Sequence, residues 1–370
     1  MAPEQIEIQL IACIVSAACA VPGVFLILRR MAMMSDAVSH AILPGIVVAF
    51  FLTKTLHSPW LLIGAAAAGL VTVVLVELLF STRLVKEDAA IGLVFPVLFS
   101  IGVVLIARFA GDIHLDTDAV LSGELAFAPF DRMLLFGVDI GPKSLVMMSA
   151  ILLVNIAFIA LFYKELKIST FDVGLAATLG FFPAVLHYGL MSLISITAVG
   201  AFDAVGSILV VALMIAPPAA AYLITDRLSW MLLLSVLIGV VSAVCGYWVA
   251  HWMDASISGC IASTAGVVFF ATVLFAKHNG LISVWTRNRR LRWSYAEKML
   301  AIHLRQHEGQ PEEGRENREQ HLTEHLGWSS DFASRVVRHA RDDGFVTAVD
   351  GRLFLSEAGR ALASEAITDE

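Results

Sequence analysis

The sequence predicts an all-α polytopic membrane protein of about nine transmembrane helices, with a small cytoplasmic winged helix-turn-helix domain at its C-terminal end. Apolar residues make up 58% of the 370 residues, well above the roughly 45–50% typical of soluble domains, and the mean hydropathy is +0.80. The charge balance also changes along the chain. Residues 1–290 hold 15 Lys and Arg against 17 Asp and Glu, whereas residues 291–370 hold 10 against 15. We therefore predict a transmembrane domain over 1–290 and a soluble, mildly acidic domain over 291–370.

Nine apolar segments are long enough to cross the hydrocarbon layer, which takes about 20 helical residues. We place them at 6–28, 36–56, 59–80, 89–110, 143–163, 178–198, 202–224, 229–251 and 256–277. If residue 1 lies outside, the inside loops hold eight Lys and Arg, and the outside loops and span ends hold four. The positive-inside rule favours this orientation, and an odd number of spans then places the C-terminal domain in the cytoplasm.

Several predicted spans contain residues that disturb a helix. Examples are Pro44-Gly45, Pro96, Pro183, the pair Gly200 and Gly206, and Pro217-Pro218. Such residues are tolerated in lipid where neighbouring helices satisfy the freed backbone groups, or where the backbone lines a pathway. The small residues of 64–69 are expected to let two helices pack closely. The pattern favours a transporter or channel over a single-pass receptor.

The stretch from Arg29 to Gly45 places a carboxylate and an imidazole at the start of the second span. Asp36 and His40 are four residues apart, so a helix presents both on one face. An Asp at the centre of a membrane helix costs about 2.5–3.5 kcal/mol, so such groups usually face a cavity, a partner or an ion. An oxygen and a nitrogen donor together suit a divalent metal of borderline hardness. The alternative is that Asp36 complements the helix dipole while a neighbouring helix satisfies His40.

The sequence excludes several kinds of chemistry. No G-x-x-x-x-G-K-[ST] motif occurs, so an ATPase of the P-loop class would have to be another subunit. The four cysteines lie in apolar segments without CxxC spacing, which predicts neither a disulfide framework nor a zinc finger. Residues 164–180 form an inside loop in which we expect Ser169 or Thr170 to cap a short helix that ends at Gly180. This helix is either a docking element for a partner or only a connector.

The last 80 residues have the order of a winged helix. We expect helices over 294–307 and 319–326, a helix from Ser329 or Ser330 to 343, and a closing helix capped by Ser356. Strands at 345–349 and 352–355 flank Asp350-Gly351, a strong signal for a two-residue hairpin. Helix-turn-helix followed by a β-hairpin is the winged-helix order.

Residues 29–50 read RRMAMMSDAVSHAILPGIVVAF, which resembles the signature of the permease subunits of manganese/zinc/iron ABC transporters. Four further blocks stand in the order of that family, at 87–104, 116–127, 171–180 and 201–228. Two departures are that Leu121-Ser122-Gly123 replaces the usual LFG, and that 218–221 read PAAA rather than PAAT. The resemblance covers residues 6–280.

That resemblance implies the transmembrane permease subunit of an ATP-driven importer in the bacterial cytoplasmic membrane. The expected partners are an ATP-binding subunit, an extracytoplasmic metal-binding protein, a second permease subunit in a homo- or heterodimer, and membrane lipid. No cofactor is expected to be permanently bound, and the cargo is manganese, iron or zinc, with a lean towards the manganese/iron branch. The residues implied for the metal path are Asp36, His40 and Asp203. Those implied for ATPase docking are Phe171, Asp172, Gly174, Ala177 and Gly180.

Residues 322–363 resemble the DNA-binding domain of metal-dependent repressors of the diphtheria-toxin-repressor type. Arg335, Arg338 and Arg341 recur every third residue on the expected recognition helix, where they can meet phosphates or bases. The acidic balance of residues 291–370 opposes nucleic-acid binding, so a protein-contact or dimerising domain is at least as well supported. Two i,i+4 histidine pairs, His303/His307 and His321/His325, suggest metal sensing.

Two alternatives to the importer remain open at this point. One is an ATP-independent secondary metal transporter. The other is a membrane-tethered metal-responsive regulator, in which the spans sense metal and the C-terminal domain binds DNA.

Overall fold

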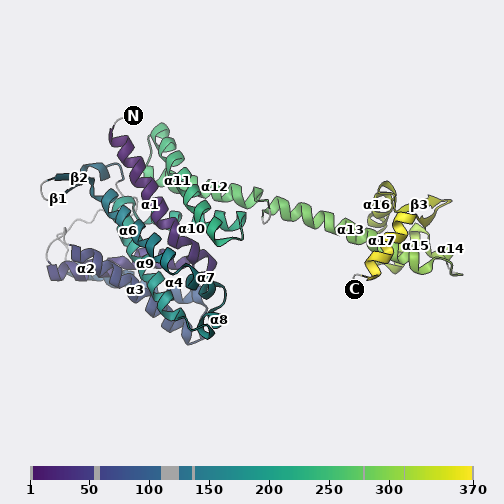
Figure 1. The fold of residues 1–370 in the computed structure, drawn as a ribbon, viewed down its shortest axis with the longest axis horizontal. Coiled ribbons are helices and arrows are strands. Elements are labelled where there is room, and N and C mark those ends of the chain that lie inside the picture. Colours follow the sequence, from purple (N-terminus) through teal and green to yellow (C-terminus); the bar gives the residue numbers. More distant parts are fainter. Residues whose placement is uncertain are drawn as a thin grey trace. The chain divides into compact units, whose positions relative to one another are not determined.

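The chain divides into two compact units, residues 1–280 (unit 1) and 281–370 (unit 2). The structure is a computed structural model, and Figure 1 shows the path of the chain. It describes residues 3–53, 59–109, 125–135, 138–277, 280–311 and 313–368. The boundary predicted after residue 290 lies ten residues beyond the observed division, within helix α13 (Leu281–His307).

Within the described residues, nine helices of unit 1 are long and apolar enough to cross a membrane, and this confirms the predicted number of candidate spans. They are α1 (Pro3–Leu28), α2 (Met33–Thr53), α3 (Pro59–Ser81), α4 (Glu87–Phe109), α6 (Lys143–Leu161), α9 (Pro183–Val205), α10 (Ser207–Ile224), α11 (Leu228–Met253) and α12 (Ile257–Phe275). The shorter elements are η1 (Ala128–Phe130), β1 (Arg132–Leu135), β2 (Val138–Pro142), α7 (Tyr163–Phe171) and α8 (Val173–Thr178), with β1 and β2 antiparallel. The block at 116–127 lies largely outside the described residues.

Two predicted span boundaries are wrong. The sixth span was expected at 178–198, but α8 ends at Thr178 and Gly180 turns the chain with φ +85° before α9 begins at Pro183. Proline suits the first turn of a helix because a backbone N–H at that position would have no acceptor within the helix, so its absence costs nothing. The seventh span begins at Ser207 rather than 202, because Gly206 separates α9 from α10 with φ +80°. A backbone in this left-handed region favours glycine.

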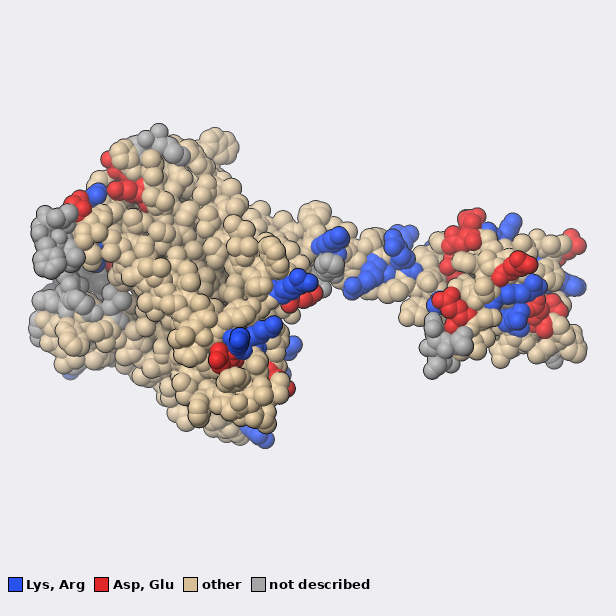
Figure 2. Space-filling model, viewed as in Figure 1, with Lys and Arg blue, Asp and Glu red and all other residues tan. Residues whose placement is uncertain are grey.

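Helix α1 lies among α6, α9, α10 and α11 and is the most buried of the nine (Figure 1). In the most apolar 18-residue stretch of α1, 78% of the residues are buried, whereas the corresponding share is 17% in α4, α6 and α12. A helix that is apolar on all sides can be buried completely or face lipid, so packing alone separates the two roles. On the face of unit 1 seen in Figure 2, charged side chains gather in separate groups and leave a broad uncharged surface between them.

Small residues bring the helix backbones close together, as predicted for 64–69. A Cβ built on Gly45 of α2 would lie 2.2 Å from the carbonyl oxygen of Gly64 in α3. A Cβ on Gly69 would lie 2.1 Å from Ser195 Oγ of α9, and that hydroxyl donates to the carbonyl of Ala66 at 3.0 Å. The α2–α3–α9 group therefore depends on glycine at both crossings.

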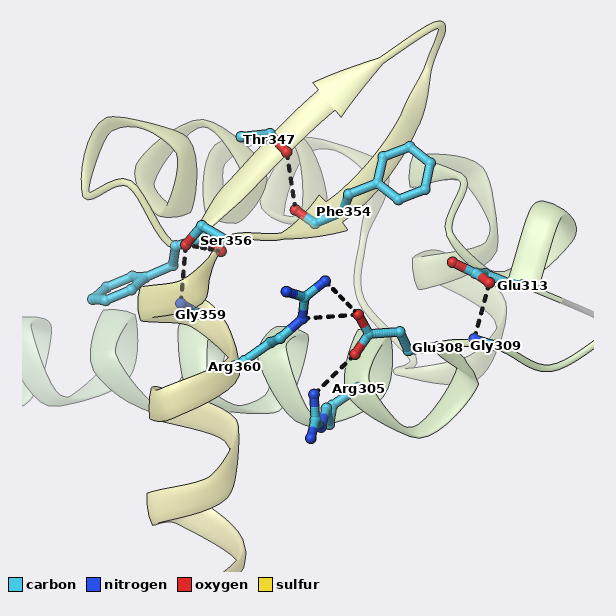
Figure 3. A network of polar contacts seen from close by, with 10 residues as sticks. Arg305, Glu308, Gly309, Glu313, Thr347, Phe354, Ser356, Gly359 and Arg360 are labelled. Carbon is cyan, nitrogen blue, oxygen red and sulfur yellow. Dashed lines mark hydrogen bonds and ion pairs between the residues drawn. The ribbon is translucent and has the colours of Figure 1, made fainter.

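Unit 2 contains α13, α14 (Glu313–Glu316), α15 (Glu319–His325), α16 (Ser330–Asp342), the antiparallel strands β3 (Val346–Val349) and β4 (Arg352–Leu355), and α17 (Glu357–Thr368). The predicted hairpin is confirmed, with Asp350 and Gly351 both at positive φ as a two-residue turn requires. Ser356 Oγ accepts from the N–H of Gly359 at 3.0 Å, and so caps α17 as predicted (Figure 3). Side chains of α13, α15, α16, the hairpin and α17 share one apolar core.

Candidate metal pathway and docking surface

Helix α2 begins immediately after a tight turn at the end of α1. Arg30 has φ +62°, and Ser35 Oγ donates to the carbonyl of Ala32 at 3.0 Å. Asp36 lies in the first turn of α2, where a carboxylate complements the positive helix end. One turn later, His40 Nε2 lies 3.3 Å from Asp36 Oδ1. The predicted pair therefore forms on one face of α2.

The Asp36–His40 pair lies between α2 and α4 and remains accessible. The His40 ring stacks beside Phe95 at a centroid distance of 5.9 Å and meets the edge of Phe99 at 6.2 Å. The two side chains keep 35% and 32% of their surface exposed. One carboxylate oxygen and one imidazole nitrogen so placed can bind a divalent metal loosely, because a tight structural site takes four ligands.

The structure pairs Asp36 with His40 but does not bring Asp203 to them. Asp203 lies near the end of α9 with its side chain exposed, and no hydrogen bond or ion pair joins it to either residue. Among the described residues of unit 1, no third His, Cys, Asp or Glu completes a group of three ligands. The described part of unit 1 thus offers two candidate metal donors on this face of α2.

Residues 163–180 fold into two short helices that present apolar side chains to solvent. Phe171 is 65% exposed, whereas Leu166 and Ala176 are buried and hold α7 and α8 in place. The expected cap at Ser169 or Thr170 is wrong, since both lie inside α7. Instead Asp172 caps α8, and its Oδ1 accepts from the N–H of Leu175 at 2.9 Å. The exposed apolar residues of this segment and its exit are Phe171, Val173, Leu175, Leu179 and Phe182.

Arg29 connects this segment to two long helices, a role that sequence reasoning missed. Its Nε and Nη2 donate to Thr170 Oγ1 and Ser169 Oγ, both at 3.3 Å, and its Nη1 lies 3.1 Å from His187 Nδ1. From the sequence alone, Arg29 is one of the eight Lys and Arg residues assigned to the inside loops. The available signal was an arginine directly after an apolar span, facing a loop rich in hydroxyl groups.

A partly buried acid in the third membrane helix is a second polar group that sequence reasoning missed. Glu77 lies in α3, and its Oε2 has no hydrogen-bond partner among the described residues. Glu77 and His187 line a cavity of about 150 Å³ with Met34, Val76 and other apolar side chains. The signal was an acid within the third predicted span, since acidic residues in membrane helices usually face protein or water.

The three arginines of α16 lie on its exposed side. Ala333, Val336, Val337 and Ala340 face the core of unit 2, so Arg335, Arg338 and Arg341 point away from it. Arg335 is already paired with Asp331, with Nη2 and Oδ2 2.6 Å apart. Two of the three arginines therefore remain without an ion pair among the described residues.

Comparisons with known proteins agree with this architecture. The profile of the ABC 3 transport family matches residues 5–276. The zinc transport system membrane protein TroD of Treponema pallidum is 48% identical over 357 residues, which cover 96% of this chain and 97% of that protein. The manganese transport system membrane protein MntD of Bacillus subtilis is 48% identical over 270 residues, 73% of this chain and 91% of that protein.

Among solved structures, PsaBC from Streptococcus pneumoniae in complex with Fab matches 73% of this chain and 91% of the other, with a TM-score of 0.60 and 28% identity. The family profile ends before unit 2, whereas the match to TroD is too long to exclude it. Unit 2 therefore has a counterpart in at least one relative.

Proposed function

This chain belongs to the ABC 3 transport family, and we propose that it is the transmembrane permease subunit of an ATP-driven importer of divalent transition metal ions. The relatives named above are membrane proteins of zinc and manganese transport systems, and a chelated iron transport protein of Yersinia pestis is 27% identical over 279 residues. The cargo is accordingly manganese, zinc or iron.

The Asp36–His40 pair is the observation that carries the metal assignment. A path ligand must release its ion, so two accessible donors 3.3 Å apart suit transit better than a closed site. A second permease subunit would supply further donors and complete the coordination. Asp203, exposed near the end of α9, serves as an additional acidic group along the same route.

The exposed apolar segment around Phe171 is the docking surface for an ATP-binding subunit. The chain has no P-loop, so the free energy of ATP hydrolysis must enter from another protein. Asp172 and Gly180 set the two ends of α8, and Gly174 and Ala177 lie within it. The bonds from Arg29 to Ser169 and Thr170 give this surface a mechanical link to α1 and α9.

The orientation follows from charge, with the N-terminus outside and unit 2 in the cytoplasm. An extracytoplasmic metal-binding protein would then deliver the ion at the outer face. Unit 2 has the element order of a winged helix, and we assign it to that class. Because Arg335 is engaged by Asp331 and residues 291–370 are acidic, a protein contact fits this domain better than nucleic acid.

Metal uptake into proteoliposomes that contain the complete assembly tests the proposal. Radiolabelled manganese, zinc and iron are supplied in turn, with and without ATP inside the vesicles. We expect ATP-dependent uptake of at least one metal. His40→Gln and Asp36→Asn should reduce it about tenfold or more, since even outer-shell changes around a metal cost about 10–100-fold.

His251→Gln is the matched control, because this histidine of α11 stacks on Tyr247 and lies outside the proposed path. Its uptake should equal that of the wild type. Uptake that needs no ATP would identify a secondary transporter instead. Normal uptake by His40→Gln would reject the path assignment.

A further inference from the structure

Unit 2 brings the two predicted histidine pairs together around one buried carboxylate. His303 and His307 lie on the last turns of α13, His321 and His325 lie on α15, and Glu316 ends α14 between them. Two groups of three ligands, His303–His307–Glu316 and Glu316–His321–His325, each have their ligand atoms within 4.8 Å of one another. Glu316 belongs to both groups, so the five side chains form a single cluster.

The carboxylate of Glu316 is buried without a hydrogen bond to Oε2. Its side chain is 7% exposed, and Oε2 accepts no hydrogen bond from any residue that the structure describes. Burying an ionised carboxylate is costly unless a cation or donors compensate it. Two imidazoles lie close to Oε2, with His325 Nε2 at 3.7 Å and His321 Nδ1 at 3.9 Å.

The α13 histidines have the form that metal ligands need. His303 is 7% exposed. Its Nε2 lies 3.4 Å from the carbonyl oxygen of Glu316, so a proton on Nε2 leaves a lone pair on Nδ1. Ligating histidines typically donate their other N–H to such a carbonyl. His307, whose ring centroid lies 4.9 Å from that of His303, has a buried Nδ1 with no hydrogen-bond partner among the described residues.

His321 is the ligand that must change most. Arg315 Nε donates to its Nε2 at 2.9 Å, so the proton of the neutral ring sits on Nδ1, the nitrogen nearer to Glu316. Binding through Nδ1 would require Arg315, which is exposed, to move away. His303, His307 and Glu316 already form one group of three ligands. His325, whose ring centroid lies 6.1 Å from that of His303, would turn towards them to supply a fourth ligand. Three imidazoles with one carboxylate suit a borderline divalent ion.

Contacts on either side of the cluster hold its backbone in place. The carboxylate of Glu308 bridges Arg305 at 3.0 Å and Arg360 of α17 at 2.6 Å (Figure 3). Glu313 Oε2 accepts from the N–H of Gly309 at 2.9 Å. The carbonyl of Asn317, next to Glu316, accepts from the N–H of Leu353 in β4 at 2.8 Å. A site whose supporting backbone is fixed loses little entropy when the ion binds.

In a third group of possible ligands in unit 2, the buried carboxylate is already paired with a histidine. His339 Nδ1 lies 2.6 Å from Glu297 Oε1 and 3.4 Å from Asp343 Oδ2, and its ring stacks on Trp293. The buried acid of that group therefore already has a partner, and the contact ties α13 to α16. Glu316 lacks such a partner at Oε2.

From these contacts we propose that unit 2 binds one divalent transition metal ion through Glu316, His303, His307 and His325, with His321 as an accessory group. The ion joins the end of α13 to α14 and α15. This site is separate from the Asp36–His40 pair and does not depend on the transport function. Because metal binding is coupled to folding, the bound ion would stabilise the arrangement of α13, α14 and α15.

Equilibrium dialysis of the full chain in nanodiscs tests the proposal, with any affinity tag removed and Zn²⁺ as the probe. All variants carry His40→Gln, so that the translocation path does not contribute. We expect one tightly bound Zn²⁺ per chain. The double variant His307→Gln/His325→Gln and the single variant Glu316→Gln should weaken binding about 100-fold or more, since even outer-shell changes cost about 10–100-fold. Co²⁺ should give visible absorption bands that the same variants lose.

His307 and His325 are not fully buried, so their replacement tests binding with the least risk to folding. Amide hydrogen exchange of α17 checks that unit 2 stays folded in each variant. His339→Gln is the matched control and should bind Zn²⁺ as the parent does. Equal affinity in the double variant and the parent would overturn the proposal. Loss of binding in His339→Gln alone would also overturn it and would place the ion at the other group.

Discussion

Replacing Gly45 by Ala should destabilise the membrane unit, because α2 and α3 touch at this residue through their backbones. The new Cβ would lie 2.2 Å from the carbonyl oxygen of Gly64 and 2.6 Å from the Cβ of Ala68. Real Cβ contacts essentially never fall below 3.0 Å, so the two helices must separate by at least 0.8 Å locally. The neighbouring atom is backbone, which cannot rotate away.

Forced overpacking of this kind costs about 1–3 kcal/mol. A loss of that size corresponds to a fall in the unfolding midpoint of about 2–4 °C per kcal/mol for a chain of a few hundred residues. We therefore expect Gly45→Ala to melt several degrees below the wild type in the same detergent, followed by intrinsic tryptophan fluorescence. Metal uptake should fall with it, because the same helix carries Asp36 and His40.

Gly92→Ala is the matched control, since a Cβ on this residue of α4 meets nothing within 4 Å. Alanine is the better helix former, so this change should be neutral or stabilising by about 0.5–1 kcal/mol. Gly64→Ala should resemble Gly45→Ala, and the double variant should be less damaging than the sum, because both changes strain one contact. Equal melting of Gly45→Ala and Gly92→Ala would show that the close α2–α3 approach is not present.

Two further predictions concern the docking segment and unit 2. Phe171→Ser should weaken co-purification of the ATP-binding subunit, because it removes an exposed apolar contact. Arg29→Gln should preserve co-purification but lower coupling, measured as ions transported per ATP hydrolysed. Equal coupling in Arg29→Gln and the wild type would contradict the proposed link through Arg29. Arg360→Gln should speed amide exchange in α17 at neutral pH by an amount equivalent to about 0.5–1 kcal/mol, since the pair is partly exposed. The bond from Arg360 lowers the pKa of Glu308, so this stabilisation is present above the ordinary glutamate pKa and is lost as pH falls through the lowered value. The wild type and the variant should therefore converge in acid, and a difference that persists there would refute this cause.

Sequence patterning alone determined most of the architecture. Nine apolar segments correspond to nine candidate membrane helices in the part of the chain that the structure describes, because a span of about 20 apolar residues has few other stable environments. The Asp350-Gly351 hairpin and the Ser356 cap also formed as predicted, since both depend on residues within a few positions of each other. The Asp36–His40 contact belongs to this local class, because four residues on a helix fix the distance.

Tertiary structure decided everything that joins distant parts of the chain. No sequence spacing places Arg29 beside Ser169 and His187, which lie 140 and 158 residues away. The same holds in unit 2, where two histidine pairs became one cluster only because the chain folds Glu316 between α13 and α15. Local rules operate through neighbouring dihedral angles and fixed helical spacing, whereas these contacts depend on how whole helices pack. Packing is governed by shape at a few crossings, such as Gly45 on Gly64, and the small residues of 64–69 do not by themselves identify the partner helix.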